Sequence, residues 1–476
     1  MKADEGNSLP KNISWLMVGN VGGTALMGVM VLLLPKLVPV ETYGFWQLYV
    51  FYATYLGYFS FGIADGLYLR FSGRPLSAIN PRIVSSHLLF LVPTITLAMG
   101  ALAWGASRIL EDPVRRSIVA LACLSTLFYL CRTLLSFLYQ AANRMELYAI
   151  CLIIERSVFL GGTLALIAAG YHNLIALLAM DTLGRAIGLC YAMVRASEHV
   201  VARPLPLRAA LSEVGASFAG GIFVSASSLA TVLVAAVARW GADQAFGVRI
   251  FAEVALAFAL VNMVQTVLNS VGMSLLPSIR RTGGDYAASY RRAYRIATPL
   301  MVVGLLTYPL VAWIMRWWLP HYVHLTTYLA ALFPMLLTEA KARLLAIPFL
   351  QAARRERLMA AIMVGAVACA VAATWYSTTV LHSPLATVLS LTLAVFVRAF
   401  VLEFTVRACL DVEFNWRILL EIAIIIVFLW GTLVQGGWLG FGAYASLIAL
   451  YLTTLLPGLV QRPSNRPRHS TSSPLS

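Results

Sequence analysis

Apolar runs of about 20 residues recur along the whole chain, and short segments between them carry most of the charge. A helix rises about 1.5 Å per residue, so a run of this length matches the hydrocarbon thickness of a bilayer. The pattern predicts fourteen membrane-spanning helices, over residues 13–35, 44–63, 83–105, 117–140, 146–170, 173–194, 213–238, 249–276, 296–317, 326–352, 358–378, 384–408, 418–434 and 437–460.

A repeat relates the two halves of the chain. An acid, an aromatic residue and a glycine open the second span in Glu41–Gly44 and the eighth span in Asp243–Gly247. Internal repeats of this length are typical of transporters. We expect an all-α integral membrane protein with two pseudo-symmetric six-helix lobes and a C-terminal helix pair. Its predicted parts are a cytoplasmic N-terminus 1–12, an N-lobe 13–194, a cytoplasmic linker 195–212, a C-lobe 213–408, spans 13 and 14 within 409–460, and a disordered cytoplasmic tail 461–476.

Composition and charge support this assignment. The chain is 60% hydrophobic and 12% charged, whereas an ordinary soluble domain has about 25% charged residues. Counted in alternate loops, one set holds 22 Lys and Arg residues and the other holds 7, among them Arg115 and Arg239. The positive-inside rule therefore predicts that both termini are cytoplasmic. The net charge of +15 is explained by these loops, so we expect no nucleic-acid partner.

The fourth span carries a charged residue in its middle. Arg132 lies on one helical face with Ser125, Tyr129, Ser136 and Tyr139, at steps of three and four residues. An arginine in hydrocarbon is costly, so it faces protein, water or an anion. This face is expected to look into a cavity.

Five more cations lie inside predicted spans. At 1.5 Å per residue from the predicted cytoplasmic ends, all six are about 12 to 17 Å deep and share one level. The set is Arg132, Arg156, Arg185, Lys341, Arg343 and Arg398.

Some of these cations have an acid close in sequence. The pairs are Asp181 with Arg185, Glu339 with Arg343, and Arg398 with Glu403. For these three, a structural ion pair and a role in transport remain alternatives. Arg132 and Lys341 have no acid at i±3 or i±4, and Arg156 points away from its neighbour Glu155. These three are expected to line the transport route, and ion pairs between helices are the alternative.

Polar and aromatic residues line one face of the second span. They are Gln47, Phe51, Tyr55, Tyr58, Gly62 and Asp65, and Asn20 and Thr24 of the first span can stand beside them. Flat rings among amides and hydroxyls suit sugars, although tyrosines at helical spacing are also common packing residues. The eighth span adds the polar stripe Asn262, Gln265 and Asn269.

Other chemistry is sparse. The sequence has no nucleotide-binding Gly-x-x-x-x-Gly-Lys-Ser/Thr motif and no His-Glu-x-x-His zinc motif, so we predict no enzyme, metal or cofactor. Asp65 and Glu253 are the candidates for coupling to an ion. The loop 278–295 holds five arginines and three tyrosines at helical spacing, which predicts a short helix on the anionic cytoplasmic surface.

Three short motifs carry a resemblance to a known family. They are VETYGFWQLY at Val40–Tyr49, GIADGLYLR at Gly62–Arg70 and LLPSIRR at Leu275–Arg281. Over about residues 13–460 the chain resembles the Wzx-type flippases, the polysaccharide branch of the multidrug/oligosaccharidyl-lipid/polysaccharide (MOP) exporter superfamily.

The resemblance implies a function. It implies alternating access of two lobes in the bacterial inner membrane, moving a polyprenyl-diphosphate-linked oligosaccharide, such as an O-antigen, capsule or exopolysaccharide repeat unit, to the outer leaflet. Implied partners are a glycan polymerase and a chain-length regulator. The six embedded cations would include the diphosphate site, and the glycan path would be Asn20, Gln47, Tyr55, Tyr58, Asn262, Gln265 and Asn269. Three alternatives remain: a cation-coupled multidrug exporter, a lipid II-type flippase, and a membrane partner of a glycan polymerase that does not transport.

Overall fold

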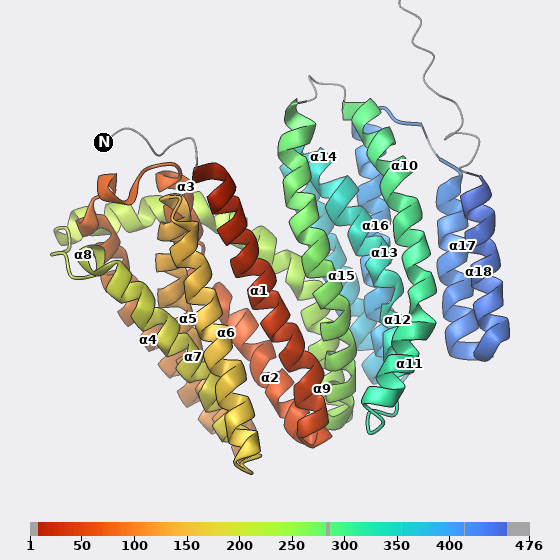
Figure 1. The fold of residues 1–476 in the computed structure, drawn as a ribbon, viewed down its shortest axis with the longest axis horizontal. Helices are drawn as coiled ribbons and strands as arrows, with labels where there is room; N and C mark the ends of the chain where they lie inside the picture. Colours follow the sequence, from red (N-terminus) through yellow and green to blue (C-terminus); the bar gives the residue numbers. More distant parts are fainter. Residues whose placement is uncertain (1–7, 282–285, 354, 414, 455–476) are drawn as a thin grey trace, which may run out of the picture.

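The computed structural model describes residues 8–281, 286–353, 355–413 and 415–454, except the side chains of 8–13, 16, 266–281 and 356. The described chain is almost entirely helical, with no β-strand, as the period of the apolar positions predicts. Figure 1 shows the start of α1 and the end of α18 at the same end of the bundle. We call this end the termini side and the opposite end the far side.

We call the first seven helices, together with three short segments, the N-lobe, and the rest of the described chain the C-lobe. The elements of the N-lobe are α1 (Ser8–Leu37), α2 (Val40–Leu56), η1 (Gly57–Ser60), α3 (Ile63–Phe71), η2 (Leu76–Ala78), α4 (Pro81–Ile109), α5 (Pro113–Ala141), α6 (Met145–Ala168), α7 (Leu174–Arg195) and α8 (Ser197–Val200). The predicted continuous span 44–63 is wrong, because the helix ends at Leu56 and restarts at Ile63. Positive φ angles of 47° at Phe61 and 77° at Gly62 break it between these residues.

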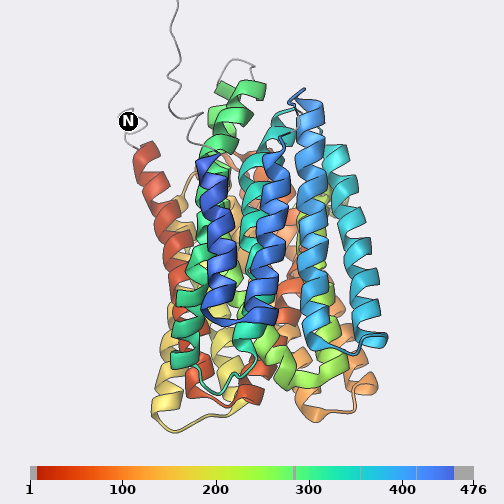
Figure 2. The ribbon, with the colours of Figure 1, turned by 90° about the vertical axis from the view of Figure 1, so that its right-hand side faces the viewer.

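The C-lobe begins with a long element that crosses the molecule twice. The element α9 (Leu207–Arg281) is two helices joined at Gly247, where φ is 81° and ψ is 174°. The remaining elements are α10 (Tyr286–Gly304), η3 (Leu305–Thr307), α11 (Tyr308–Trp318), α12 (Leu325–Leu332), α13 (Pro334–Lys341), the π-helical η4 (Ala342–Ala346), α14 (Ile347–Ala352), α15 (Glu356–Thr379), α16 (Pro384–Cys409), α17 (Arg417–Trp430), η5 (Gly431–Gln435) and α18 (Gly437–Thr453). Figures 1 and 2 show α17 and α18 as a pair at one edge of the bundle.

The helices make this a multi-pass membrane protein. Ten helices in the described part of the chain are long and apolar enough to cross a bilayer. The remaining predicted spans correspond to α2 and α18, which have 17 residues each, to the second half of α9, and to the broken series α12–α14. The total of fourteen therefore stays a prediction.

The tyrosine-rich segment after α9 packs its tyrosines against protein. It forms the first turns of α10, where Tyr290 is 1% exposed and packs edge-on against Phe349. The hydroxyl of Tyr294 donates a 2.7 Å hydrogen bond to Glu421 of α17. The segment is part of a longer helix rather than a separate short one, and its aromatic face packs against protein, a contact that spacing alone cannot distinguish from membrane binding. Contact of its arginines with the membrane surface stays a prediction.

The first half of α9 packs against α3 of the N-lobe. Gly66 and Gly221 make this possible, because a Cβ on Gly66 would collide with the backbone of Ser217, and one on Gly221 with the backbone of Gly62. Span 7 therefore starts on the N-lobe and reaches the C-lobe near the far side (Figure 1). Helices that approach this closely need small residues at the contact.

Further contacts join the lobes at the far side. Gly44 of the first repeat motif lies against Val248, next to the second motif, and a Cβ there would be 2.6 Å from the Val248 carbonyl oxygen. The indole nitrogen of Trp318 donates to the Leu32 carbonyl at 2.8 Å. Arg115 binds both oxygens of Asp243, at 2.6 and 2.8 Å. The two segments that the repeat relates in sequence thus meet in space.

The α3–α9 contact yields a test with a matched neighbour. We expect Gly221→Ala to lower the free energy of unfolding by about 1 to 3 kcal/mol, because the added methyl group collides with backbone. Gly220→Ala meets nothing closer than 3.9 Å and gains about 1 kcal/mol of helix propensity. Thermal unfolding of the detergent-purified variants measures both effects. Equal melting temperatures of the two variants would contradict the close packing of α3 against α9.

Candidate functional site

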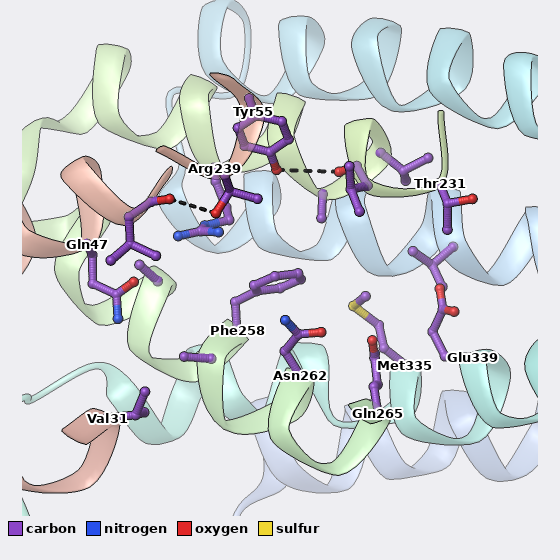
Figure 3. A pocket seen from close by; sticks show the side chains of 18 of the residues that line it. Val31, Gln47, Tyr55, Thr231, Arg239, Phe258, Asn262, Gln265, Met335 and Glu339 are labelled. Atoms are coloured by element: carbon purple, nitrogen blue, oxygen red, sulfur yellow. Dashed lines mark hydrogen bonds between the residues drawn. The ribbon is translucent and has the colours of Figure 1, made fainter. Parts of the chain in front are cut away.

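Three adjoining cavities lie between the lobes and share Met27 on their walls. The central cavity, of about 200 Å³, lies between α1, α2, α9, α13 and α16. The N-lobe cavity, of about 370 Å³, is lined mainly by α2, η1, α5, α6, α7 and the first half of α9. The α1 cavity, of about 470 Å³, is lined by α1, α6 and α9. Figure 3 shows the central cavity with side chains from several helices pointing into it.

In the N-lobe, one glutamate holds two arginines. The Glu155 carboxylate on α6 is 2.9 Å from Nε of Arg132 on α5 and 3.6 Å from a terminal nitrogen of Arg156. The side chain of Arg132 is 4% exposed, whereas that of Arg156 is 24% exposed. Arg156 lines both the N-lobe cavity and the α1 cavity. We call Arg132, Glu155 and Arg156 the N-lobe triad.

The C-lobe contains the same arrangement. Glu339 on α13 pairs with Arg398 of α16 and, at 3.0 Å, with Arg343. The Arg398 side chain is 2% exposed and that of Arg343 is 23% exposed, and all three residues line the central cavity. We call them the C-lobe triad. The predicted pair of Arg398 with Glu403 is wrong, because α13 brings Glu339 against this guanidinium.

The two predicted pairs at i,i+4 are confirmed. Arg343 contacts Glu339 as described above, and Nε of Arg185 lies 2.8 Å from Asp181. Asp181 also accepts a 2.6 Å hydrogen bond from the hydroxyl of Tyr49 on α2. Arg185 and Asp181 line the N-lobe cavity together with Tyr58 and Asp65.

Lys341 belongs to a separate buried network. Its ammonium lies 2.5 Å from both Glu403 and Glu421. Glu403 also binds Arg407, and Tyr451 donates to Glu421 at 3.1 Å. The expectation that Arg132 and Lys341 lie on the transport route because no acid is near in sequence does not match this geometry. Both have an acid from another helix, and neither is on the walls of the three cavities.

The predicted glycan-path residues fall into different cavities. Gln47, Tyr55, Asn262 and Gln265 line the central cavity, Tyr58 the N-lobe cavity, and Asn20 and Asn262 the α1 cavity. The Asn20 side chain accepts a 3.0 Å hydrogen bond from the hydroxyl of Tyr148. The side chain of Asn269 lies outside the described residues.

The two candidates for ion coupling have different surroundings. Asp65 of α3 is half-buried on the wall of the N-lobe cavity. Glu253 is 5% exposed and accepts a 2.8 Å hydrogen bond from the backbone nitrogen of His324. Glu253 thus holds the loop between α11 and α12 against α9, and its role in ion binding stays a prediction.

The sequence pattern assigns no role to three buried charged residues, Glu421, Arg407 and Arg239. Glu421 is the first acid of span 13, and an acid within such an apolar run is a signal that could have identified it. Arg407 and Arg239 were counted as loop residues, and both are buried. Arg239 lines the central cavity rather than an outer loop, because α9 continues as helix for two turns beyond it.

The central cavity is rich in hydrogen-bond donors. Within the described part of the chain, four buried nitrogens on its wall have no hydrogen-bond partner: Nε1 of Trp46, Nε of Arg239, Nε2 of Gln265 and Nε of Arg398. Buried donors normally find acceptors, so this wall is suited to a ligand rich in oxygen.

No family model and no curated protein matches the sequence. Solved structures do match. A structure described as the lipid II flippase MurJ in an inward closed conformation aligns with a TM-score of 0.64 at 11% identity, over 93% of this chain and 98% of that chain. An inward-facing multidrug resistance MATE family transporter of the MOP superfamily aligns with a TM-score of 0.60 at 12% identity, over 83% and 94%. The chain therefore has the fold of MOP-superfamily transporters.

The triads predict unequal roles for their two arginines. We expect Arg132→Met to lower the free energy of unfolding by about 3 to 5 kcal/mol, because Glu155 loses its short contact in a buried site. Arg156→Met leaves that contact intact, so a loss of about 1 kcal/mol or less is expected. Arg398→Met and Arg343→Met should follow the same order. Chemical or thermal unfolding in detergent measures the difference, and a reversed order would refute the geometry.

Proposed function

We propose that this protein is a flippase that moves a polyprenyl-diphosphate-linked oligosaccharide from the inner to the outer leaflet of the bacterial cytoplasmic membrane. The observation that carries the proposal is the pair of triads, one in each lobe, on adjoining cavities. Each triad presents one partly exposed arginine, Arg156 or Arg343, to a cavity.

Charge supports an anionic cargo. Each triad holds two arginines and one glutamate, so each contributes one net positive charge. A diphosphate diester carries two negative charges. A guanidinium group can donate two parallel hydrogen bonds to two oxygens of a phosphate. Two triads on two lobes would therefore neutralise one diphosphate from opposite sides.

Depth supports a lipid-linked cargo. Arg156 lies about 16 Å along α6 from Met145, and Arg343 about 14 Å from the end of α14 at Ala352. If the termini side is cytoplasmic, as the loop charges predict, both lie between the inner leaflet surface and the midplane. A membrane potential that is negative inside then favours outward movement of the anion, by about 2.3 kcal/mol per charge per 100 mV.

The walls also suit a glycan. Trp46, Tyr55, Gln47 and Gln265 line the central cavity, so rings lie beside amides and unpaired donors. Sugars offer apolar faces and hydroxyl groups to such a surface. A cationic drug would instead meet a net positive site, which argues against a multidrug exporter. A lipid II-type cargo would use the same diphosphate chemistry and differ in its glycan.

The proposal predicts a transport defect from the exposed arginines. In vesicles that contain a fluorescent polyprenyl-diphosphate-linked oligosaccharide, we expect Arg156→Gln and Arg343→Gln to slow flipping about 10- to 100-fold. This is the effect of losing a charge-assisted hydrogen bond worth about 1.5 to 3 kcal/mol. Neither change leaves a buried glutamate without an ion pair. Arg132 still pairs with Glu155 in the first variant, and Arg398 still pairs with Glu339 in the second. Flipping is read as the fraction of label that an external reagent bleaches over time.

Arg316→Gln serves as the control, because Arg316 is exposed at the end of α11 away from the cavities. It should flip at the wild-type rate. Normal flipping by both triad variants, at normal protein levels, would refute the assignment of the diphosphate site to the triads. Efflux of an organic cation by the wild type would favour the drug exporter, and a wild type that moves neither cargo would favour the role without transport.

A further inference from the structure

Arg239 is a buried arginine for which the triads give no explanation. It is 9% exposed, and within the described residues it forms no ion pair and its Nε has no hydrogen-bond partner. Every other buried arginine of the cavity walls has an acid within ion-pair distance. A buried charge without an acid is costly unless a ligand or a polar partner completes it.

Three phenylalanine rings hold the guanidinium in place. Its central carbon lies 5.5 Å from the ring centre of Phe51, 5.8 Å from that of Phe251 and 5.2 Å from that of Phe258. The ring faces attract the cation, but they are not conventional hydrogen-bond acceptors for its five N–H groups. The side chain is therefore fixed while its donors stay available.

The position of Arg239 separates it from the C-lobe triad. Figure 3 shows Arg239 beside Gln47 at one end of the central cavity and Glu339 beside Met335 at the other. Along the helices, Arg239 is about 12 Å from the far-side turn at Gly247, whereas Arg398 is about 21 Å from the far-side end of α16 at Pro384. The cavity thus has a cation at each end, and the one nearer the far side is unpaired.

We infer that Arg239 is a second anion site, which receives the phosphate groups of the cargo after they leave the triads and before release at the far side. This inference rests on the proposed function for its cargo. The site offers a fixed guanidinium in a pocket with the unpaired indole N–H of Trp46 on the same wall. A transport route with a single deep anion site would hold the cargo, and a second site lets it move onward.

Arg239→Met is the diagnostic variant, with Arg239→Lys as the conservative one and Arg316→Met as the control. Without ligand, the Met variant should melt at the wild-type temperature or higher, because it removes an unpaired buried charge and keeps packing against the rings. A rise in melting temperature with added inorganic pyrophosphate, compared with chloride at equal ionic strength, reports anion binding. Arg239→Met should lose at least about half of that rise, and Arg316→Met none of it.

Transport kinetics separate this site from the loading site. In the vesicle assay the maximal flipping rate of Arg239→Met should fall about tenfold or more, with a half-saturating cargo concentration within about twofold of wild type, since loading uses the triads. Arg239→Lys should recover part of the rate, because it keeps the charge but not the paired donors.

Each other outcome is informative. If Arg239→Met keeps both the pyrophosphate response and the rate, the inference is wrong and the triads stand. If it melts several degrees lower without ligand, Arg239 is a structural brace. If the wild type flips no glycan lipid while its pyrophosphate response still depends on Arg239, the anion site stands and the proposed cargo fails.

Discussion

Charge burial inside a membrane bundle is the constraint on which this structure depends. An arginine without a partner in hydrocarbon is costly, and a glutamate is equally so. Each lobe resolves the problem with one glutamate and two arginines, of which one is buried and one partly exposed. Both arginines contact the acid, and the two guanidinium charges exceed the single carboxylate charge by one. Each carboxylate thus has one buried guanidinium and one partly exposed guanidinium beside it.

The contacts between the lobes differ on the two sides of the cavities. Their far-side contacts include a glycine against Val248, an indole hydrogen bond to Leu32, and the paired hydrogen bonds of Arg115 with Asp243. On the other side of the cavities, α3 and the first half of α9 approach so closely that glycines are needed. The alternating access that the family resemblance implies would require the first set to break when the protein opens toward the far side.

The fold alone does not select a cargo. The structures that share it are described as a lipid II flippase and as a multidrug transporter, and both align at low identity. Fold and function separate in this way when function depends on the walls of a cavity. Here the walls combine a net positive charge with unpaired donors at Trp46, Arg239, Gln265 and Arg398. A cargo rich in oxygen and negative charge complements them.

Local rules determined much of this protein. Apolar runs of bilayer length fixed an all-helical membrane protein, the repeat of Glu41–Gly44 and Asp243–Gly247 identified segments that meet in space, and i,i+4 spacing identified the pairs of Arg185 and Arg343. Helical periodicity fixes such neighbours because they lie on one helix.

Only the tertiary structure decided which helices face one another. Arg132 and Lys341 pair with acids from other helices, and Arg398 pairs with Glu339 instead of Glu403. Arg239 lies on the cavity wall and not in the loop that the sequence predicts. Sequence spacing carries no information about contacts between helices, so a cation without a local acid looks the same whether another helix pairs it or leaves it for a ligand.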